Sequence, residues 1–402
     1  MKIAFHTLGC KVNMYETETL KRLYISQGYE VTDFNEKADI YLINTCSVTA
    51  VADKKSRQMI SRAKSKNPDA QVIVTGCFVQ GMSEEEKAAL NVSRVIDNVE
   101  KNKLLAEAEL LTPIVEGSRV RADIKIEDGC NSFCTYCIIP YKRGRIECRS
   151  IESIIDEVKA LANAGHREIV LTGIHISSYG SENLLKLISE VAAVEGVDRV
   201  RLGSLEPRII TKDFLDRLKE IPQFCPHFHL SLQSGCDKTL KAMNRHYTAD
   251  EYRQGVKLIR SVFEHPAITT DVIVGFPGET EEDFEKSKQF VDEMQFYHMH
   301  IFPYSRREGT IAARMEGQLT NAEKSRRVGI LEEIDKKNSK LFEDYYTGRK
   351  VTILTEEIVN NDGMKYIVGH TETYVKGYVP ADGLDINQMV LCEVSEDGWK
   401  VV

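Results

Sequence analysis

The chain has 402 residues, a formal net charge of −8 and 42% apolar residues, values that are normal for a soluble globular protein. Its length exceeds one ordinary hydrophobic core, so we expect two or three domains. No stretch approaches the length that crosses a bilayer, and the first residues lack the apolar run of a signal peptide, so we expect a cytoplasmic protein without a membrane partner. Ten cysteines in such a chain favour metal binding over disulfides.

The first hundred or so residues alternate short apolar runs with amphipathic stretches, which is typical of an open parallel α/β domain. The pattern predicts strands at 2–6, 39–43 and 71–74, and helices at 16–27, 49–66 and 83–90. Ser83 and Glu86 have the spacing of a capping box, which marks the beginning of the third helix.

One cysteine follows each of these three strands, and we refer to Cys10, Cys46 and Cys77 as the N-terminal triplet. The carboxyl ends of parallel strands lie on one edge of a sheet, where ligands bind, so we expect the three thiols to converge. A single buried cysteine at such a place could be an ordinary core residue. Three cysteines in matching positions predict a metal cluster that is held by three thiolates and keeps one metal position open.

From residue 123 to residue 302 the sequence alternates six times between strand-like and helix-like patterns. Strands are predicted near 122–127, 168–171, 199–203, 227–231, 268–274 and 297–302. Helices are predicted near 151–164, 183–194, 212–219, 237–242, 249–260 and 281–293. Six consecutive units predict a partial (β/α)6 barrel, with an active site at the carboxyl ends of its strands.

A second set of thiols follows the first barrel strand directly, and we refer to Cys130, Cys134 and Cys137 as the barrel triplet. A loop this tight can wrap its thiolates around one compact metal centre. Three ligands on a four-iron cluster leave one iron open, and an open position is where chemistry occurs. Cys148 is the nearest possible fourth ligand, and we interpret it as a bystander. The alternative is a structural zinc site completed by a distant His or Cys, although such sites usually use paired two-cysteine motifs.

A helix is predicted at 321–340, and after Gly348 the pattern changes to short strands near 351–354, 366–369, 374–379, 390–394 and 399–402. These strands predict a small all-β domain, a five-stranded barrel of oligonucleotide-binding type. The predicted domains are 1–113, 114–344 and 345–402, with a short connection near Leu111-Thr112-Pro113. The last domain holds nine Asp or Glu and five Lys or Arg, an unusual charge for an RNA-binding surface.

With both triplets in view, the chain resembles the radical S-adenosylmethionine (SAM) methylthiotransferases along essentially its whole length. The barrel triplet matches the superfamily signature, and the N-terminal triplet matches the family's second set of cluster ligands. The C-terminal strands are similar to the family's TRAM domain, which binds RNA in its tRNA-modifying members. The run Leu8-Gly9-Cys10-Lys11-Val12-Asn13 resembles the branch that acts on N6-threonylcarbamoyladenosine in tRNA.

The resemblance implies methylthiolation of carbon 2 of threonylcarbamoyladenosine at position 37 of tRNA, with two 4Fe-4S clusters and SAM as both methyl donor and radical source. Carbon 2 carries an unactivated C–H bond that no side-chain acid or base can break, so a cofactor must supply a radical. The barrel triplet would hold the cluster that binds SAM, and the N-terminal triplet would hold the cluster that carries the methylated sulfur. A low-potential electron donor and a sulfur source are the further partners implied.

Small and polar residues after the predicted barrel strands are candidates for binding SAM. Gly173 would allow close approach, Glu206 would meet the ammonium group or the ribose, and Arg245 would bind the carboxylate with its planar fork. The complete set is Thr172, Gly173, Ser204, Glu206, Gln233, Arg245 and Asp271. For Asp271 a core salt bridge is the alternative.

A basic stretch beside the barrel triplet is the expected contact with tRNA phosphates, and it comprises Lys142, Arg143, Arg145 and Arg149. Within the same enzyme class, N6-isopentenyladenosine in tRNA or a ribosomal-protein aspartate is the alternative substrate. From a different class, the alternative is an RNA-binding iron–sulfur sensor or electron carrier without catalysis.

Overall fold

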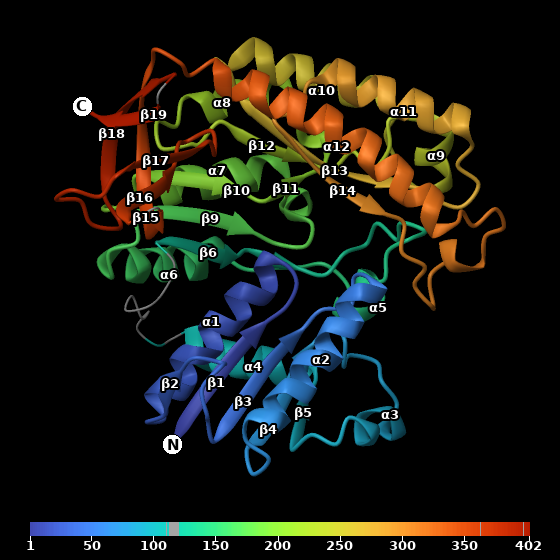
Figure 1. The fold of residues 1–402 in the computed structure, drawn as a ribbon, viewed down its shortest axis with the longest axis vertical. Helices are drawn as coiled ribbons and strands as arrows, with labels where there is room; N and C mark the ends of the chain where they lie inside the picture. The colour runs from blue at the N-terminus through green and yellow to red at the C-terminus, as the bar shows by residue number, and fades with distance from the viewer. Residues whose placement is uncertain (110, 112–119, 362, 397) are drawn as a thin grey trace.

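The computed structural model describes residues 1–109, 111, 120–361, 363–396 and 398–402. It arranges them as an N-terminal parallel sheet, a central barrel of parallel strands and a C-terminal antiparallel sheet (Figure 1). The predicted α/β class and the order of these parts are confirmed. Among the described helices, none combines the length and the apolar character that crossing a bilayer requires. The predicted connection at 112–113 and the boundary after it lie outside the described residues, so the division into three domains stays a prediction.

The N-terminal sheet has the parallel strand order β2-β1-β3-β4-β5. Its strands are β1 (Lys2–Thr7), β2 (Glu30–Thr32), β3 (Ile40–Thr45), β4 (Gln71–Gly76) and β5 (Arg94–Ile96). Its helices are α1 (Lys11–Ser26), α2 (Ala50–Lys66), α3 (Glu84–Ala89) and α4 (Asn98–Glu109). Every residue of β3 is buried, as expected for a central strand with helices on both faces of the sheet. The predicted capping box of Ser83 and Glu86 is present at the beginning of α3.

The six predicted barrel strands are present: β6 (Arg121–Lys125), β9 (Glu168–Thr172), β10 (Arg199–Leu202) continued by β11 (Ser204–Leu205), β12 (His227–Leu230), β13 (Ala267–Val274) and β14 (His298–Pro303). They form two parallel groups, β10-β9-β6 and β11-β12-β13-β14, which meet at Gly203. In the described part of the chain β6 and β14 are not paired, so the barrel is open on one side. This is the partial barrel that six strand–helix units predicted.

Helices cover the outside of the barrel and bury its largest apolar core. They are α6 (Ile151–Asn163), α7 (Ser181–Ala192), α8 (Lys212–Lys219), α9 (Asp237–Ala242), α10 (Ala249–Val262), α11 (Glu281–Met294) and α12 (Asn321–Asp344). Three short elements flank the barrel triplet: β7 (Glu127–Asp128), α5 (Ile139–Arg143) and β8 (Glu147–Cys148). Most predicted helix boundaries agree with the structure within two residues, since Thr and Ser caps mark many of the starts.

The C-terminal sheet has the antiparallel order β17-β16-β15-β18-β19. Its strands are β15 (Lys350–Asn361), β16 (Met364–His370), β17 (Lys376–Pro380), β18 (Met389–Ser395) and β19 (Gly398–Val401). The five strands are confirmed, but the predicted barrel of oligonucleotide-binding type is not, because the described residues show no hydrogen-bonded pairing between β17 and β19. Gly377 of β17 instead packs on Trp399 of β19, where a Cβ would lie 2.7 Å from the indole ring. Side-chain packing rather than a strand ladder therefore joins the two edges.

The C-terminal sheet covers the amino-terminal end of the barrel through Tyr374. The Tyr374 ring stacks on His227, the first residue of β12, with ring centres 5.1 Å apart. The guanidinium groups of Arg121 and Arg201 lie 4.8 and 4.9 Å from the centre of the same ring. Arg201 is fully buried, and it also donates to Glu168 at 2.9 Å and to the backbone of Glu372, between β16 and β17, at 2.8 Å. Because the Arg201 guanidinium is desolvated, its contact with the ring is stronger than it would be at a surface.

Replacing Tyr374 by Ala should lower the free energy of unfolding by about 3 kcal/mol, because a large ring leaves a cavity beside buried arginines. Tyr374→Phe keeps the ring face and should cost less than about 1 kcal/mol. Urea denaturation of both variants measures the difference. Equal losses for Ala and Phe would show that the ring does not hold the two parts together.

Candidate active site

The N-terminal triplet lies at the carboxyl edge of the N-terminal sheet. Cys10 follows β1 and is the N-cap residue of α1, Cys46 follows β3, and Cys77 follows β4, where its backbone N–H donates to Thr45 at 3.0 Å. In this strand order the winding reverses between β1 and β3, and ligands of doubly wound sheets bind at that point. Burial raises the pKa of the Cys10 thiol, and the nearby Arg143 guanidinium partly opposes this increase.

The three thiols of this triplet are close enough to influence one another's ionisation. Burial raises the pKa of the Cys46 thiol, and the neighbouring thiols of Cys77 and Cys10 raise it further. Cys46 and Cys77 are buried, whereas Cys10 is exposed. A set of converging sulfur donors fits zinc or an iron–sulfur cluster, and it does not fit magnesium or calcium.

Gly9 allows this convergence. Its φ angle is +108°, a conformation that L side chains rarely adopt. A Cβ at this position would lie 2.9 Å from the Cβ and 3.1 Å from the Sγ of Cys46. A side chain on residue 9 would therefore displace the second thiol from the first.

The barrel triplet occupies a compact loop between β7 and α5. Gly129 enters the loop with φ +82°, and a Cβ there would lie 2.0 Å from the carbonyl oxygen of Arg145. The N–H of Cys130 donates to Gly144 at 3.1 Å, and the N–H of Cys137 donates to Cys134 at 2.9 Å. The loop therefore folds back on itself, with its thiols in one place.

The surroundings of the barrel triplet give two of its thiols different pKa values. Although burial alone would raise it, the pKa of Cys130 is lowered, chiefly by the His175 side chain. Burial raises the pKa of Cys137 to about 12, and the thiols of Cys134 and Cys130 contribute to the increase. Arg245 donates from Nη1 to the Sγ of Cys134 at 3.2 Å. Two cationic side chains thus lie against the sulfur atoms, as a set of thiolates requires.

His175 and Arg245 are joined through Glu206. Arg245 Nη2 donates to Glu206 Oε1 at 3.2 Å, and His175 Nε2 lies 3.4 Å from Glu206 Oε2. The neighbouring Cys130 thiol and Glu206 carboxylate raise the pKa of His175 to about 10, so its ring is a cation near neutral pH. Sequence reasoning did not select His175. Its position three residues after Thr172, in the turn that follows β9, was the signal that could have identified it.

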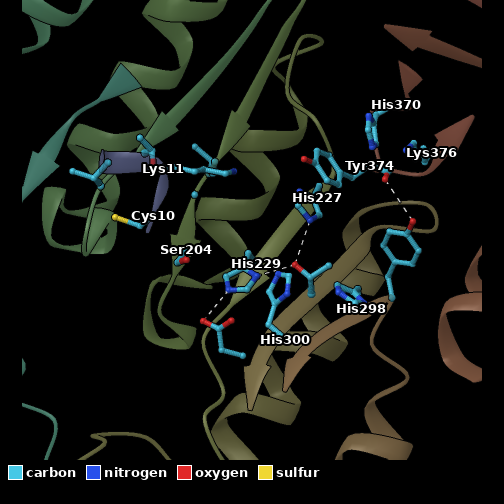
Figure 2. Close-up of a pocket in the computed structure, with 18 of the residues that line it drawn as sticks. Cys10, Lys11, Ser204, His227, His229, His298, His300, His370, Tyr374 and Lys376 are labelled. Carbon is cyan, nitrogen blue, oxygen red and sulfur yellow. Dashed lines mark hydrogen bonds and ion pairs between the residues drawn. The ribbon is translucent and has the colours of Figure 1, made fainter. Parts of the chain in front are cut away.

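A cavity of about 760 Å³ joins the N-terminal loop to the barrel interior. Figure 2 shows Cys10 and Lys11 at one side of it, and His370, Tyr374 and Lys376 at the other. Four of the seven proposed SAM residues line this cavity: Thr172, Gly173, Ser204 and Asp271. Glu206 and Arg245 lie instead beside Cys134. Gln233 is buried and pairs through its backbone with Asp271 and Ile273 of β13.

Two of the four basic residues that we expected to contact RNA form buried or partly buried ion pairs instead. The Arg143 side chain is only 1% exposed and forms ion pairs with Glu16 and Asp128 at 3.0 Å. Arg149 donates to Glu157 at 2.8 Å and to the hydroxyl of Tyr15 at 3.0 Å. These two guanidinium groups hold the parts of the protein together, and this placement corrects the expectation that they face phosphates. Lys142 and Arg145 stay candidates for RNA contact, and Arg145 is exposed.

Arg143 is the centre of a buried network that joins α1 to the barrel triplet loop. Besides its ion pairs it donates from Nη2 to Asn13, whose amide in turn donates to Leu8 at 2.6 Å and Thr45 at 3.1 Å. Glu16 is fully buried and also accepts from Lys101 at 2.9 Å. Although burial alone would raise the pKa of Glu16, the three surrounding cations hold it well below its usual range. The charges therefore compensate one another inside the protein.

Comparison with known proteins first defines the class. Residues 124–291 match the Radical SAM superfamily, and residues 2–97 match an uncharacterized protein family, UPF0004. Among solved structures, the radical SAM methyltransferase TsrM from Kitasatospora setae aligns with a TM-score of 0.57 and 16% identity over 77% of this chain and 76% of that chain. At this identity the likeness concerns the fold alone.

More similar sequences define the family. Threonylcarbamoyladenosine tRNA methylthiotransferase MtaB of Bacillus subtilis is 40% identical over 99% of this chain and 94% of its own length. The Thermotoga maritima protein of the same name is 36% identical over 93% and 90%. A tRNA-2-methylthio-N(6)-dimethylallyladenosine synthase of Thermoanaerobacter is 34% identical over 97% and 89%. This chain belongs to the radical SAM tRNA methylthiotransferases.

Replacing Arg143 by Ala should lower the free energy of unfolding by about 3 kcal/mol, because Glu16 and Asp128 would lose the cation they share and keep only Lys101 and Lys125 as counter-charges. Arg145→Ala is the matched control two residues away. It removes an exposed side chain and should change stability by less than about 1 kcal/mol. Urea denaturation measures both, and similar values for the two variants would contradict a structural role for Arg143.

The network also predicts how stability depends on acid. A carboxylate whose folded pKa is depressed takes up its proton more readily in the unfolded chain, so it stabilises above its ordinary pKa of 4.5 and loses that contribution as the pH falls. Glu16→Gln should therefore be less stable than the wild type at pH 7 and should lose less stability between pH 5 and pH 3. Urea denaturation of both proteins at successive pH values tests this. Because both carry the same cysteines, the titration of thiols contributes equally to the two curves. Parallel curves would contradict it.

Proposed function

We propose that this protein transfers a methylthio group to carbon 2 of N6-threonylcarbamoyladenosine at position 37 of tRNA. The observation that carries the proposal is the combination of near full-length family membership with two cysteine triplets, one of which opens on the cavity of the barrel. A sensor or an electron carrier would not need such a cavity beside its thiols. The proposal makes the protein an enzyme that uses SAM and two 4Fe-4S clusters.

The barrel triplet would hold the cluster that binds SAM, and the N-terminal triplet would hold the second cluster. Their donor sets fit this assignment, because each offers three thiols and no carboxylate ligand. When bound, these groups supply the one-electron chemistry and the sulfur that modification of an unactivated C–H bond requires. The remaining tasks belong to the side chains of the chain itself.

Arg245 and His175 would stabilise negative charge on the barrel triplet, and Glu206 would orient both cations. Arg245 has a second role open to it, since its fork can also bind the carboxylate of SAM. Glu206 accepts a hydrogen bond from Arg245 with one carboxylate oxygen, and its other oxygen lies 3.4 Å from His175 Nε2, so the carboxylate lies between the two cations. Thr172, Gly173 and Ser204 would line the path of the cofactor from the strand ends into the cavity.

The cavity would hold the modified base, because its volume of about 760 Å³ lies in the range of small-molecule sites. Phe302, at 45% exposure on the cavity wall, offers a ring on which an extruded base could stack. Lys142 and Arg145 would contact the phosphates beside it. Base and cofactor would thus meet between the N-terminal loop and the barrel strands.

The proposed substrate follows the branch of the relatives. Proteins named for threonylcarbamoyladenosine are 35–40% identical to this chain, and those named for dimethylallyladenosine are 34–35% identical. The difference is small, but the sequence around Cys10 points the same way. A low-potential electron donor and a sulfur source complete the reaction as partners.

Mass spectrometry of tRNA nucleosides tests the proposal. A strain that lacks the gene should lose 2-methylthio-threonylcarbamoyladenosine, and the wild-type gene should restore it. Cys77→Ala or Cys137→Ala should not restore it, because each removes one of three thiols from a site. Cys148→Ala, the nearest cysteine outside the triplets, should restore it fully.

An unchanged level of this nucleoside in the deletion strain would contradict the proposal. Loss of the dimethylallyladenosine product instead would assign the protein to the other branch. Iron and sulfide analysis of anaerobically purified protein adds a readout independent of activity. A variant without the barrel triplet should retain about half of the wild-type iron, because the two sites are separate.

A further inference from the structure

Three polar side chains meet on the inner face of the barrel, in the wall of the cavity that Cys10 also lines. They are His229 of β12, Asp271 of β13 and His300 of β14, and one ligand atom from each lies within 4.8 Å of the others. Asp271 and His300 are direct register partners in the parallel pair of β13 and β14. His229 is the register partner of Thr269, two residues before Asp271 and therefore on the same face. All three line the cavity (Figure 2).

The hydrogen bonds of this group leave capacity for a ligand. His229 is held on both ring nitrogens, by Thr269 Oγ1 at 3.0 Å and by Asp271 Oδ2 at 3.3 Å. In the part of the chain that the structure describes, Asp271 makes no other side-chain bond, and the His300 ring makes none. The group therefore presents at least one free acceptor and one free donor to the cavity.

The other residues of the cavity wall make it polar as well. His298 lies at 2.9 Å from Asp335, and Glu343 accepts from the hydroxyl of Tyr297 at 3.4 Å. Lys11 and Lys376 add a cation at each side. Among the described lining residues, Val12 and Leu202 are aliphatic, and the rings of Tyr297, Phe302 and Tyr374 add further apolar surface. The distinctive feature of the wall is therefore the hydrogen-bonding group of His229, Asp271 and His300, placed among apolar surface.

We propose that His229, Asp271 and His300 bind the threonylcarbamoyl group of the substrate and thereby select it over a dimethylallyl group. The inference rests on the proposed function and specifies how its site reads the substrate. The threonylcarbamoyl group carries urea N–H groups, a hydroxyl and a carboxylate. Asp271 accepts from an N–H or O–H of the ligand, His300 donates to an oxygen, and His229 holds Asp271 in place.

A dimethylallyl group offers none of these hydrogen bonds. It would remove water from Asp271 and His300 without replacing it, and leaving such groups unpaired is costly. Sites built to hydrogen-bond a substrate reject an analogue that lacks the polar group far better than apolar pockets reject an extra one. The group therefore acts as a specificity determinant. It faces the substituent on the adenine, which is polar in the substrate of one branch of the family and apolar in that of the other.

A divalent cation is the competing ligand, since two histidines and one carboxylate can hold one. The surroundings favour the substrate, because the group lies in the wall of a large open cavity rather than in a compact cage.

Binding of anticodon stem-loop oligonucleotides to the anaerobically prepared holoenzyme tests the proposal. Three probes differ only at position 37, which carries threonylcarbamoyladenosine, dimethylallyladenosine or adenosine. His300→Phe keeps a ring of similar size on an edge strand, and Asp271→Asn keeps the side-chain shape. His265→Phe is the control, since its ring stacks between Phe342 and Tyr345 outside the cavity wall.

Each test variant should raise the Kd for the threonylcarbamoyl probe by about 10- to 100-fold and change the Kd for the adenosine probe less than about 3-fold. The control should leave all three values unchanged. Equal losses for all probes, or none, would overturn the inference. So would a divalent metal, in excess of the cluster iron, that elemental analysis finds in the wild type and not in Asp271→Asn.

The same preparations separate this inference from the proposed function. If the wild type methylthiolates the threonylcarbamoyl probe while both variants keep its preference, the function stands and the inference fails. If the wild type modifies only the dimethylallyl probe, the proposed function itself fails.

Discussion

The structure depends on one set of buried charges, the network between Arg143, Glu16, Asp128 and Lys101. Glu16 comes from the helix that begins at Cys10, and Arg143 comes from the short helix that follows the barrel triplet. Ion pairs of this kind hold their partners in one geometry, because any opening would leave a charge without water or counter-ion. The network thereby fixes the distance between two cysteine sites that belong to different sheets. A surface contact could not do so, since exposed pairs contribute little.

The two triplets reach similar chemistry by different routes. The barrel triplet is a local feature, because eight residues and a glycine entry bring its thiols together. The N-terminal triplet is a property of the sheet, because its three residues are neighbours only when β1, β3 and β4 are paired. Both are supported by side chains that come from elsewhere: Arg245 donates to a thiol of the first, and Asn13 closes the loop of the second. Positioning is thus distributed over the fold.

Sequence patterns predicted the elements well and the partners poorly. Periodicity located all six barrel strands, since their apolar runs are bounded by clear caps and turns. It missed the three-residue strands β2 and β5 and the helix α4, and it began the first helix too late. The sequence pattern placed the cysteines correctly at strand ends but wrongly predicted that Arg143 contacts RNA. A sequence cannot show that Glu16, 127 residues away, accepts a hydrogen bond from the Arg143 guanidinium. The position of His175 beside Cys130 and Glu206, and that of His300 beside Asp271, were missed for the same reason, because these neighbours are distant in the sequence.

The contacts of Tyr374 limit how this protein can be truncated or have its C-terminal sheet exchanged for that of a relative. The Tyr374 ring covers the guanidinium groups of Arg121 and the fully buried Arg201, so a chain that ends before the last sheet would expose both to solvent. The C-terminal sheet therefore closes the amino-terminal end of the barrel and is part of its structure, not an independent RNA-binding module. Exchange of this segment between relatives would succeed only if the aromatic residue and both arginines were transplanted as one unit.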